Sequence, residues 1–317
     1  MATKLAVEVH ALRKNYGSTQ AVAGVDLHVA FGEVFALLGP NGAGKTTTVE
    51  ILEGHRQRSE GEVRVLGHDP GKGERQFKER IGIVLQSTGI EPYLTVEETI
   101  DFFRSAYPHP RPLDEVLKAT EMTDLRRARV RKLSGGQQRR LDVAVGLAGD
   151  PELLFLDEPT TGFDPSARRN AWQMIKNLKA LGKTVFLTTH YMDEAQFLAD
   201  RLAIMARGKI VAEGSPESVT GLGNMTTIRF RLPNHASLPL GLPPAVNTDG
   251  MWEIKSPSPV GVLAELTGWA AKQGLDLPEL TVSRPSLEDT YLDLVGHAEE
   301  GEVKEPQKAR STEGRGR

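Results

Sequence analysis

The chain lacks three features that mark large classes of proteins. None of its 317 residues is cysteine, which excludes disulfide bonds, thiolate metal sites and thiol catalysis. No apolar run approaches the roughly 20 residues that a helix needs to cross a bilayer, and the longest runs are the short segments 34–38 and 153–156. The formal net charge is only −3, so bulk attraction to nucleic acid or to anionic membranes is not indicated. We therefore expect a soluble protein without a membrane-spanning segment of its own.

What the chain does have is an alternation of strand-like and helix-like segments over its first ~220 residues. Short apolar runs bounded by glycine, proline or aspartate are typical of strands buried on both faces of a parallel sheet. Here they occur at 34–38, 81–85, 153–156 and 184–188. Helical patterns intervene at 46–52, 137–148, 166–181 and 192–200. This order predicts a parallel sheet covered by helices, with additional, antiparallel strands in 5–29 and 61–66.

The pattern changes after residue 220, where a small α+β appendage is predicted. Ser286 and Asp289 have the spacing of a capping box at the start of its last helix. The expected strands are 226–231, 251–255 and 280–283, the expected helices 260–272 and 286–295, and the expected loop 233–246. The charged tail has almost no apolar residue, so we expect it to be disordered. The predicted domains are therefore 4–220, 223–296 and the tail 297–317.

Residues 39–46 match the pattern G-x-x-x-x-G-K-[ST] directly after an apolar strand and before a helical segment. The glycines allow the backbone N–H groups to converge on phosphate oxygens, and the positive end of the helix dipole adds to this attraction. Lys45 is expected to reach the β- and γ-phosphates, and the Thr46 hydroxyl to hold Mg²⁺. The segment predicts a phosphate-binding loop.

Two carboxylates follow the apolar run 153–156. Asp157 and Glu158 would therefore lie at the carboxyl edge of the sheet, where open α/β sheets bind their ligands. Asp157 can hold Mg²⁺ directly or through water. Glu158 points differently and can polarise a water for in-line attack on the γ-phosphate. Together with the phosphate loop, the pair predicts a nucleotide-hydrolysing site.

A third motif, leucine followed by Ser134, Gly135, Gly136 and Gln137, opens a helical segment. A serine and two glycines at a helix start form a second anion-binding position, this time without a lysine. With the two preceding motifs, this pentapeptide resembles the signature of the ABC transporter nucleotide-binding domain.

Further elements of that family occur in the expected order, and the resemblance gives each a role. Tyr16 looks like the aromatic that stacks on adenine, and Gln86 like the glutamine that senses Mg²⁺ and the membrane subunit. Asp164 matches the loop that crosses the dimer interface, and His190 the switch histidine that contacts the γ-phosphate. The implied nucleotide-binding residues are Tyr16, Gly39, Pro40, Asn41, Gly42, Ala43, Gly44, Lys45, Thr46, Thr47, Ser134, Gly135, Gly136 and Gln137. The implied metal residues are Thr46, Gln86 and Asp157.

The resemblance also implies a fold and an assembly. The fold class is α/β, a P-loop NTPase of ABC type, with a RecA-like parallel-sheet core, an antiparallel β subdomain and a helical subdomain. In such proteins two copies enclose two ATP molecules, each between the phosphate loop of one chain and the signature of the other. The implied cofactors are ATP and Mg²⁺, and the implied partners are a second ATP-binding subunit, in a homodimer, and a multi-span membrane permease. The implied location is cytoplasmic, peripheral on the inner face of the cell membrane.

Within the family, the segment 285–295 resembles the daunorubicin-resistance type of exporter ATPase. Such subunits work with separately encoded permeases, so the sequence does not indicate the cargo. The segment 91–100 is either a surface that meets the membrane subunit or a capped surface helix. The basic cluster 126–132 is more typical of a solvated face than of a nucleic-acid site, because the whole chain is mildly acidic. No nucleic-acid partner is expected.

Two other functions compete with transport. Non-transport ABC ATPases that act on ribosomes carry two such domains in one chain, and those that act on DNA carry a long coiled coil. This chain has one phosphate loop, one signature and no sustained heptad pattern. An ATP-dependent interaction module without hydrolysis is disfavoured because Glu158 and His190 are both present.

Overall fold

The structure is a computed structural model that describes residues 4–84, 89–221, 225–232, 238–239, 241–299 and 307–308. The chain divides into two compact units. The first runs from the start of the chain to Pro216 and takes in Val295–Lys308, and the second spans Glu217–Leu294. The predicted domain limits, 4–220 and 223–296, stay predictions. In the described part of the chain, no helix combines the length and the apolar character that a membrane crossing needs.

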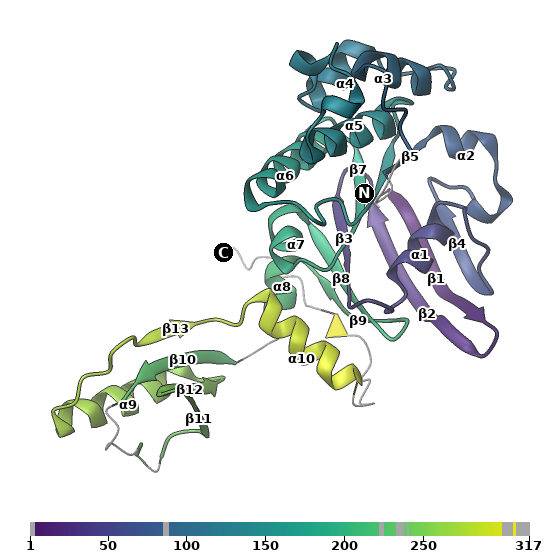
Figure 1. The fold of residues 1–317 in the computed structure, drawn as a ribbon. Coiled ribbons are helices and arrows are strands. Elements are labelled where there is room, and N and C mark those ends of the chain that lie inside the picture. The colour runs from purple at the N-terminus through teal and green to yellow at the C-terminus, as the bar shows by residue number, and fades with distance from the viewer. Residues whose placement is uncertain are drawn as a thin grey trace, which may run out of the picture. The chain divides into compact units, whose positions relative to one another are not determined.

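A seven-stranded sheet forms the centre of the first unit (Figure 1), in the order β14-β9-β8-β3-β7-β6-β5. Neighbours from β8 to β5 run parallel, whereas β9 is antiparallel to β8. The strands β3 and β7 are buried along their whole length, as their apolar runs predict. The four predicted core strands are confirmed, except that Leu85 lies outside the described residues. The bounds are β3 Val34–Leu38, β5 Ile81–Val84, β6 Leu153–Asp157, β7 Thr184–Thr189, β8 Arg201–Ala206, β9 Lys209–Gly214 and β14 Gln307–Lys308.

A three-stranded antiparallel sheet, in the order β2-β1-β4, confirms the additional strands predicted near the start of the chain. Its strands are β1 Leu5–Tyr16, β2 Thr19–Ala30 and β4 Glu60–Val65. Side chains from this sheet and from the central sheet share one hydrophobic core, in which Leu12 and Val25 join Phe35, Phe155 and Phe186. This shared core fixes the antiparallel sheet against the strand that leads into the phosphate loop.

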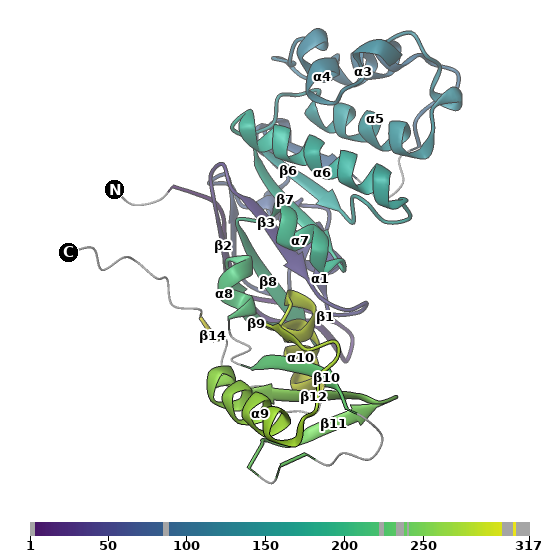
Figure 2. The same cartoon turned by 90° about the vertical axis from the view of Figure 1, so that its left-hand side faces the viewer.

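Helices α3, α4 and α5 pack against one another (Figures 1 and 2). A capping box between Thr95 and Glu98 starts α3, so the segment 91–100 contains a capped helix, which is one of the two alternatives given for it. Two arginines of the basic cluster have acidic or aromatic partners: Arg126 pairs with Glu97 and Asp114, and Arg131 lies over the Tyr93 ring. The helices of the first unit are α1 Lys45–Leu52, α2 Arg75–Glu79, α3 Val96–Arg104, α4 Leu113–Ala119, α5 Gly135–Leu147, α6 Pro165–Ala180 and α7 Met192–Leu198, and α8 Pro216–Thr220 follows them.

The second unit has a four-stranded antiparallel sheet in the order β11-β12-β10-β13, with α9 packed on β10. Its core joins Ile228, Phe230 and Ile254 to Leu266 of the helix. The predicted capping box is present, because Asp289 N–H donates to Ser286 Oγ at 3.0 Å and Ser286 N–H to the Asp289 carboxylate at 2.8 Å. The elements are β10 Thr226–Arg231, β11 Ala245–Thr248, β12 Met251–Ser256, α9 Pro259–Gln273, β13 Thr281–Ser283 and α10 Leu287–Glu299, of which the residues from Val295 on belong to the first unit.

The structure corrects two details of the C-terminal prediction. The predicted loop 233–246 ends too late, because Ala245 and Val246 already pair with β12 as part of β11. The residues of β11 are mostly exposed, so no apolar run signalled this strand. The tail 297–317 lies outside the described residues except for the end of α10 and for β14, which pairs with β9. These two segments have regular structure where none is predicted.

Candidate functional site

The loop 39–46 joins the buried strand β3 to helix α1, as predicted. Gly42 and Gly44 have φ of 81° and 103°, which side-chain-bearing residues rarely adopt. A Cβ on Gly39 would lie 2.3 Å from the carbonyl oxygen of Met205. A Cβ on Gly44 would lie 2.4 Å from the carbonyl oxygen of Ala21. The loop can therefore adopt this path only with glycine at these positions.

The Lys45 side chain lies inside this loop. Its Nζ donates to the carbonyl oxygens of Gly39 at 2.7 Å and of Pro40 at 3.1 Å. Burial lowers the pKa of Lys45, while the charges of Glu158 and Asp157 oppose that shift. The structure thus brings the predicted lysine and both predicted carboxylates within electrostatic reach of one another.

Asp157 and Glu158 stand where β6 ends, beside β7. The Thr188 hydroxyl of β7 donates to Asp157 Oδ1 at 2.5 Å, and Glu158 N–H donates to Thr188 O at 3.2 Å and to Thr188 Oγ1 at 3.1 Å. Glu158 has φ of 45°, a left-handed conformation that costs a non-glycine residue about 1–3 kcal/mol. Such strain at a candidate base indicates that its surroundings hold it in a fixed orientation.

His190 follows β7 directly, so the parallel pairing of β6 with β7 places it beside Glu158. Its Nδ1 lies 3.3 Å from Glu158 Oε1, and the two side chains are 37% and 20% exposed. The ring of Tyr191 lies against the imidazole, with 4.1 Å between ring centroids. The structure therefore brings the predicted base and the predicted switch histidine into contact at an accessible position.

The signature residues begin α5. Ser134 caps the helix: Gln137 N–H donates to Ser134 Oγ at 3.4 Å, and Ser134 N–H to Gln137 Oε1 at 2.9 Å. These residues line a cavity of about 540 Å³ together with residues near Asp164. Among the described residues, the lining includes none from the phosphate loop 39–46. In the described part of the chain, the cavity at the signature is therefore separate from the phosphate loop.

The remaining predicted site residues are Asp164, Tyr16 and Gln86, of which the first two have separate surroundings. Asp164 caps α6, because its carboxylate accepts from the backbone N–H groups of Ser166 and Ala167 at 2.8 and 3.0 Å. Tyr16 is 41% exposed, and Lys14 and Arg56 lie over its ring at 5.1 and 5.4 Å. Gln86 lies outside the described residues.

A divalent metal would need ligands from the nucleotide at this site. No cluster of three or more histidine, aspartate or glutamate side chains that could hold a metal occurs in the described ranges. Mg²⁺ commonly takes one or two carboxylates and completes its shell with water and phosphate oxygens. The exposed Thr46 hydroxyl and the Asp157 carboxylate fit that pattern.

Sequence reasoning missed a buried carboxyl group next to this site. Glu53 is only 4% exposed, and burial, with the charges of Asp157 and Glu50 added, raises its pKa from 4.5 to about 8. Between these two pH values the unfolded chain releases the Glu53 proton while the folded chain keeps it. Stability therefore falls as the pH rises through this range.

Replacing Glu53 by Gln should remove this pH dependence. We expect the variant to be more stable than the wild type by ~2–4 kcal/mol at pH 9 and by much less at pH 5, since each pKa unit corresponds to about 1.4 kcal/mol. Urea unfolding of the nucleotide-free protein in EDTA measures the difference. Glu62→Gln, at an exposed position of β4, is the control. Equal stabilisation of the Glu53 variant at both pH values would contradict the assignment.

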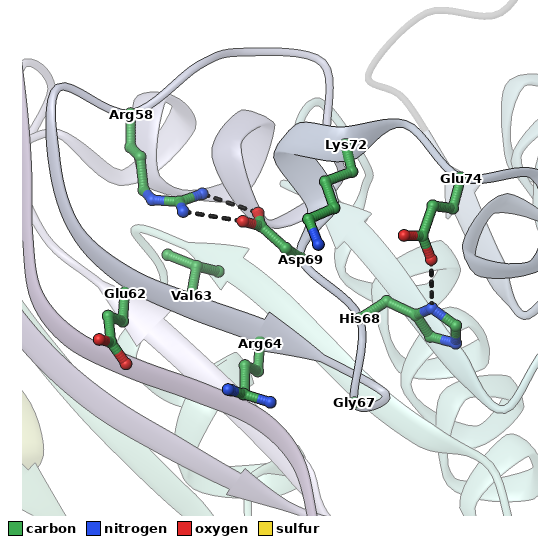
Figure 3. Close-up of a pocket in the computed structure, with 9 residues that line it drawn as sticks. All are labelled: Arg58, Glu62, Val63, Arg64, Gly67, His68, Asp69, Lys72 and Glu74. Atoms are coloured by element: carbon green, nitrogen blue, oxygen red, sulfur yellow. Dashed lines mark hydrogen bonds and ion pairs between the residues drawn. The ribbon is translucent and has the colours of Figure 1, made fainter.

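A second hollow of about 360 Å³ lies beside β4 (Figure 3). Arg58 makes two hydrogen bonds to the Asp69 carboxylate at 2.8 and 2.9 Å, and His68 Nδ1 lies 2.8 Å from Glu74 Oε2. The Arg58 guanidinium lowers the pKa of Asp69. Two pairs of side chains in this hollow therefore bind each other, and we assign the hollow no ligand.

Comparison with known proteins identifies the family. Residues 22–161 match the model of the ABC transporter family, and 226–286 match the C-terminal domain of ABC transporter domain-containing proteins. The daunorubicin resistance ATP-binding protein DrrA2 of Streptomyces coeruleorubidus is 35% identical, over 95% of this chain and 98% of its own length. The Nod factor export ATP-binding protein I of Rhizobium sp. is 36% identical, over 93% of this chain and 98% of its own length.

Solved structures give the same result for the fold. An ATP-binding cassette of an ABC transporter in its ADP conformation is similar with a TM-score of 0.60 and 25% identity, over 68% of this chain and 92% of that one. A dimeric post-hydrolysis cassette bound to ADP and Pi is similar with a TM-score of 0.58 and 27% identity, over 66% of this chain and 98% of that one. The chain belongs to the ABC transporter ATP-binding proteins, and it is an ATP-binding, ATP-hydrolysing subunit of such a transporter.

Proposed function

We propose that two copies of this chain enclose two ATP molecules, each between loop 39–46 of one copy and residues 134–137 of the other. The observation that carries this proposal is the separation of the two anion-binding positions within one chain. No described residue of the phosphate loop lines the cavity beside Ser134. The similar dimeric cassette bound to ADP and Pi supports it. The carboxylate of Asp164, which caps α6 next to that cavity, then lies at the interface of the copies.

On this proposal the loop binds the nucleotide through charge and backbone dipoles. The N–H groups of 39–47 and the Lys45 ammonium bind the phosphates, and the exposed ring of Tyr16 stacks on the adenine. Thr46 and Asp157 would hold Mg²⁺, with Gln86, which lies outside the described residues, as a further proposed ligand. When bound, the metal neutralises charge on the β- and γ-phosphates.

Hydrolysis depends on Glu158 and His190. The Glu158 carboxylate accepts a hydrogen bond from a water and orients it for in-line attack on the γ-phosphorus. The bond from that phosphorus to the bridging oxygen breaks, which leaves ADP and phosphate. His190, 3.3 Å from Glu158 Oε1, contacts the γ-phosphate. Hydrolysis removes the anion that links the two chains, so the dimer opens.

Opening and closing would move a separate multi-span permease docked near Gln86 and α3. The large exposed side chains Tyr93 and Phe102, 64% and 67% exposed, are candidates for this contact. Two relatives are named for drug resistance and for Nod factor export, so we propose that the complex exports its cargo. The chain would then lie on the inner face of the cell membrane.

Purification of the tagged chain in a gentle detergent tests this proposal. We expect a multi-span membrane protein to co-purify, and we expect Tyr93→Ser with Phe102→Ser to release it while the ATP affinity stays within about 2-fold of the wild type. Recovery of ribosomal proteins or DNA instead would favour a non-transport ATPase. Arg126 of the basic cluster already pairs with Glu97 and Asp114, which reduces the positive charge that this cluster offers to nucleic acid.

A further inference from the structure

A buried arginine holds the backbone on both sides of the candidate base. Arg139, in the second turn of α5, is 6% exposed. Its Nε donates to the carbonyl oxygen of Pro159 at 3.1 Å, and its Nη2 to the carbonyl oxygen of Asp157 at 3.1 Å. These carbonyl groups belong to the residues directly before and after Glu158, so a single guanidinium bridges the two neighbours of the base.

The conformation at Glu158 explains why such a bridge has an effect. The residue has φ of 45°, and a strained backbone of this kind persists only where its surroundings hold it. On one side, Glu158 N–H donates to Thr188 of β7 at 3.2 and 3.1 Å. On the other side, Arg139 holds the neighbouring carbonyl groups. The backbone at Glu158 therefore depends on contacts from β7 and from α5, while the carboxylate itself accepts from Thr161 Oγ1 at 3.1 Å and lies 3.3 Å from His190 Nδ1.

A guanidinium suits this position better than an ammonium. Its planar group presents several N–H donors in a fixed arrangement, whereas lysine has one compact charge on a flexible chain. Burial of the charge is unfavourable unless it is paired. Asp142, one turn further along α5, supplies a partner at 3.5 Å from Arg139 Nη1. The pair anchors the guanidinium to its own helix, so Arg139 moves when α5 moves.

The same helix begins at the signature. Gly135, Arg139 and Glu158 line one cavity of about 370 Å³, so the signature helix and the base face each other across a shared space. Only one turn of continuous α-helix separates Gly135 from Arg139. A shift at the start of α5 is therefore carried directly to the backbone around Glu158.

We propose that Arg139 is a positioning residue that couples the signature of this chain to its own catalytic base. This inference rests on the proposed function, in which the nucleotide held by the partner subunit binds Ser134–Gln137 of this chain. Occupation of that second site shifts or fixes α5, and Arg139 then sets the Glu158 carboxylate for the first site. The two ATP sites of the dimer become cooperative through this contact.

Arg139→Met and Arg139→Lys test the coupling in the full chain with its permease. For the wild type we expect a Hill coefficient near 2 for ATP in hydrolysis. In Arg139→Met, kcat should fall by about 10- to 100-fold and the Hill coefficient should approach 1. The ATP dissociation constant, measured without hydrolysis in EDTA, should change by less than about 3-fold. Arg139→Lys, which keeps the charge but not the paired donors, should have an intermediate kcat.

Arg80→Met is the matched control. Arg80 also binds a backbone carbonyl, that of Leu66 at 3.0 Å, and a carboxylate, Glu152, but it precedes β5, at the opposite end of the sheet strands from Asp157. This variant should lose stability while keeping the wild-type kcat and Hill coefficient.

A folded Arg139→Met protein with wild-type kcat and cooperativity would overturn the inference, as would a fall in melting temperature alone. If Arg139→Met does not fold, the same readouts on Arg139→Lys decide. A wild-type protein that hydrolyses ATP without forming a dimer would instead contradict the proposed function.

Discussion

Replacing Glu158 by Gln should abolish ATP turnover, by at least about 100-fold, while ATP binding is retained. Glutamine has nearly the same shape, but its amide cannot accept a proton or orient water as a carboxylate does. The backbone of residue 158 is held by its N–H group, which donates to Thr188, and by its carbonyl oxygen, which accepts from Thr161 N–H at 3.3 Å. The carboxylate accepts from Thr161 Oγ1 at 3.1 Å, and the amide oxygen of glutamine can accept the same hydrogen bond. The substitution should therefore leave the local structure intact.

Steady-state phosphate release and equilibrium binding of an ATP analogue measure the two effects separately. Glu288→Gln, an exposed position in the first turn of α10, is the control and should retain wild-type turnover. Normal phosphate release from the Glu158 variant would refute the assignment of the base, and loss of ATP binding would show that its carboxylate has a binding role instead.

Replacing Gly135 by Asp should abolish hydrolysis by a different route. A Cβ at Gly135 has no heavy atom within 4 Å, and an acidic residue in the first turn of a helix is favourable, so the chain should fold normally. On the proposed arrangement this carboxylate would face the triphosphate held by the other copy. Repulsion between the two anions should prevent the closed dimer and reduce kcat by about 100-fold or more.

Each Gly135→Asp chain should still bind ATP at its own phosphate loop with an affinity within about 3-fold of the wild type. Gly268→Asp, an exposed helical glycine of α9 that is equally free of contacts, controls for the added charge. Wild-type hydrolysis by Gly135→Asp would mean that the signature does not contact nucleotide. Loss of ATP binding by the isolated chain would mean that both motifs act on the same nucleotide within one copy.

The sequence predicted the sheet and the positions of the motifs because both depend on local patterns. The apolar runs of β3, β6 and β7 have no polar interruption, so burial on both faces was the simplest interpretation. Parallel strands place their carboxyl ends at one edge, and this alone brings Asp157, Glu158 and His190 together. In loop 39–46, close backbone contacts require glycine at positions 39 and 44, and a φ of 81° favours glycine at position 42.

The contacts that orient the site could not be predicted in this way. Arg139 lies in a run of polar residues at the start of α5, and its charge is more typical of a surface position. Its burial results from packing against residues that follow β6. Glu194 is a similar case: it is fully buried, and its carboxyl accepts from Thr160 Oγ1 at 2.8 Å and Trp172 Nε1 at 3.0 Å. Burial raises its pKa, which no sequence pattern indicated.

In the second unit too, contacts between residues close in sequence could be predicted, whereas pairing between distant segments could not. The reciprocal hydrogen bonds of Ser286 and Asp289 were predictable, because a capping box involves residues three positions apart. Strand β11 was not, because its pairing partner β12 supplies the hydrogen bonds and its own residues are mostly exposed. An exposed edge strand needs little apolar character, so its sequence resembles a loop.

The molar mass of the Glu158→Gln variant in Mg-ATP tests the central claim most directly. Light scattering should give the 34.6 kDa of one chain without nucleotide and twice that mass with Mg-ATP, since the trapped nucleotide joins a phosphate loop to the signature of a second chain. Adding the Gly135→Asp change should return the mass to that of a single chain. A protein that keeps the mass of one chain with ATP fully bound, while the wild type turns over under the same conditions, would contradict the account.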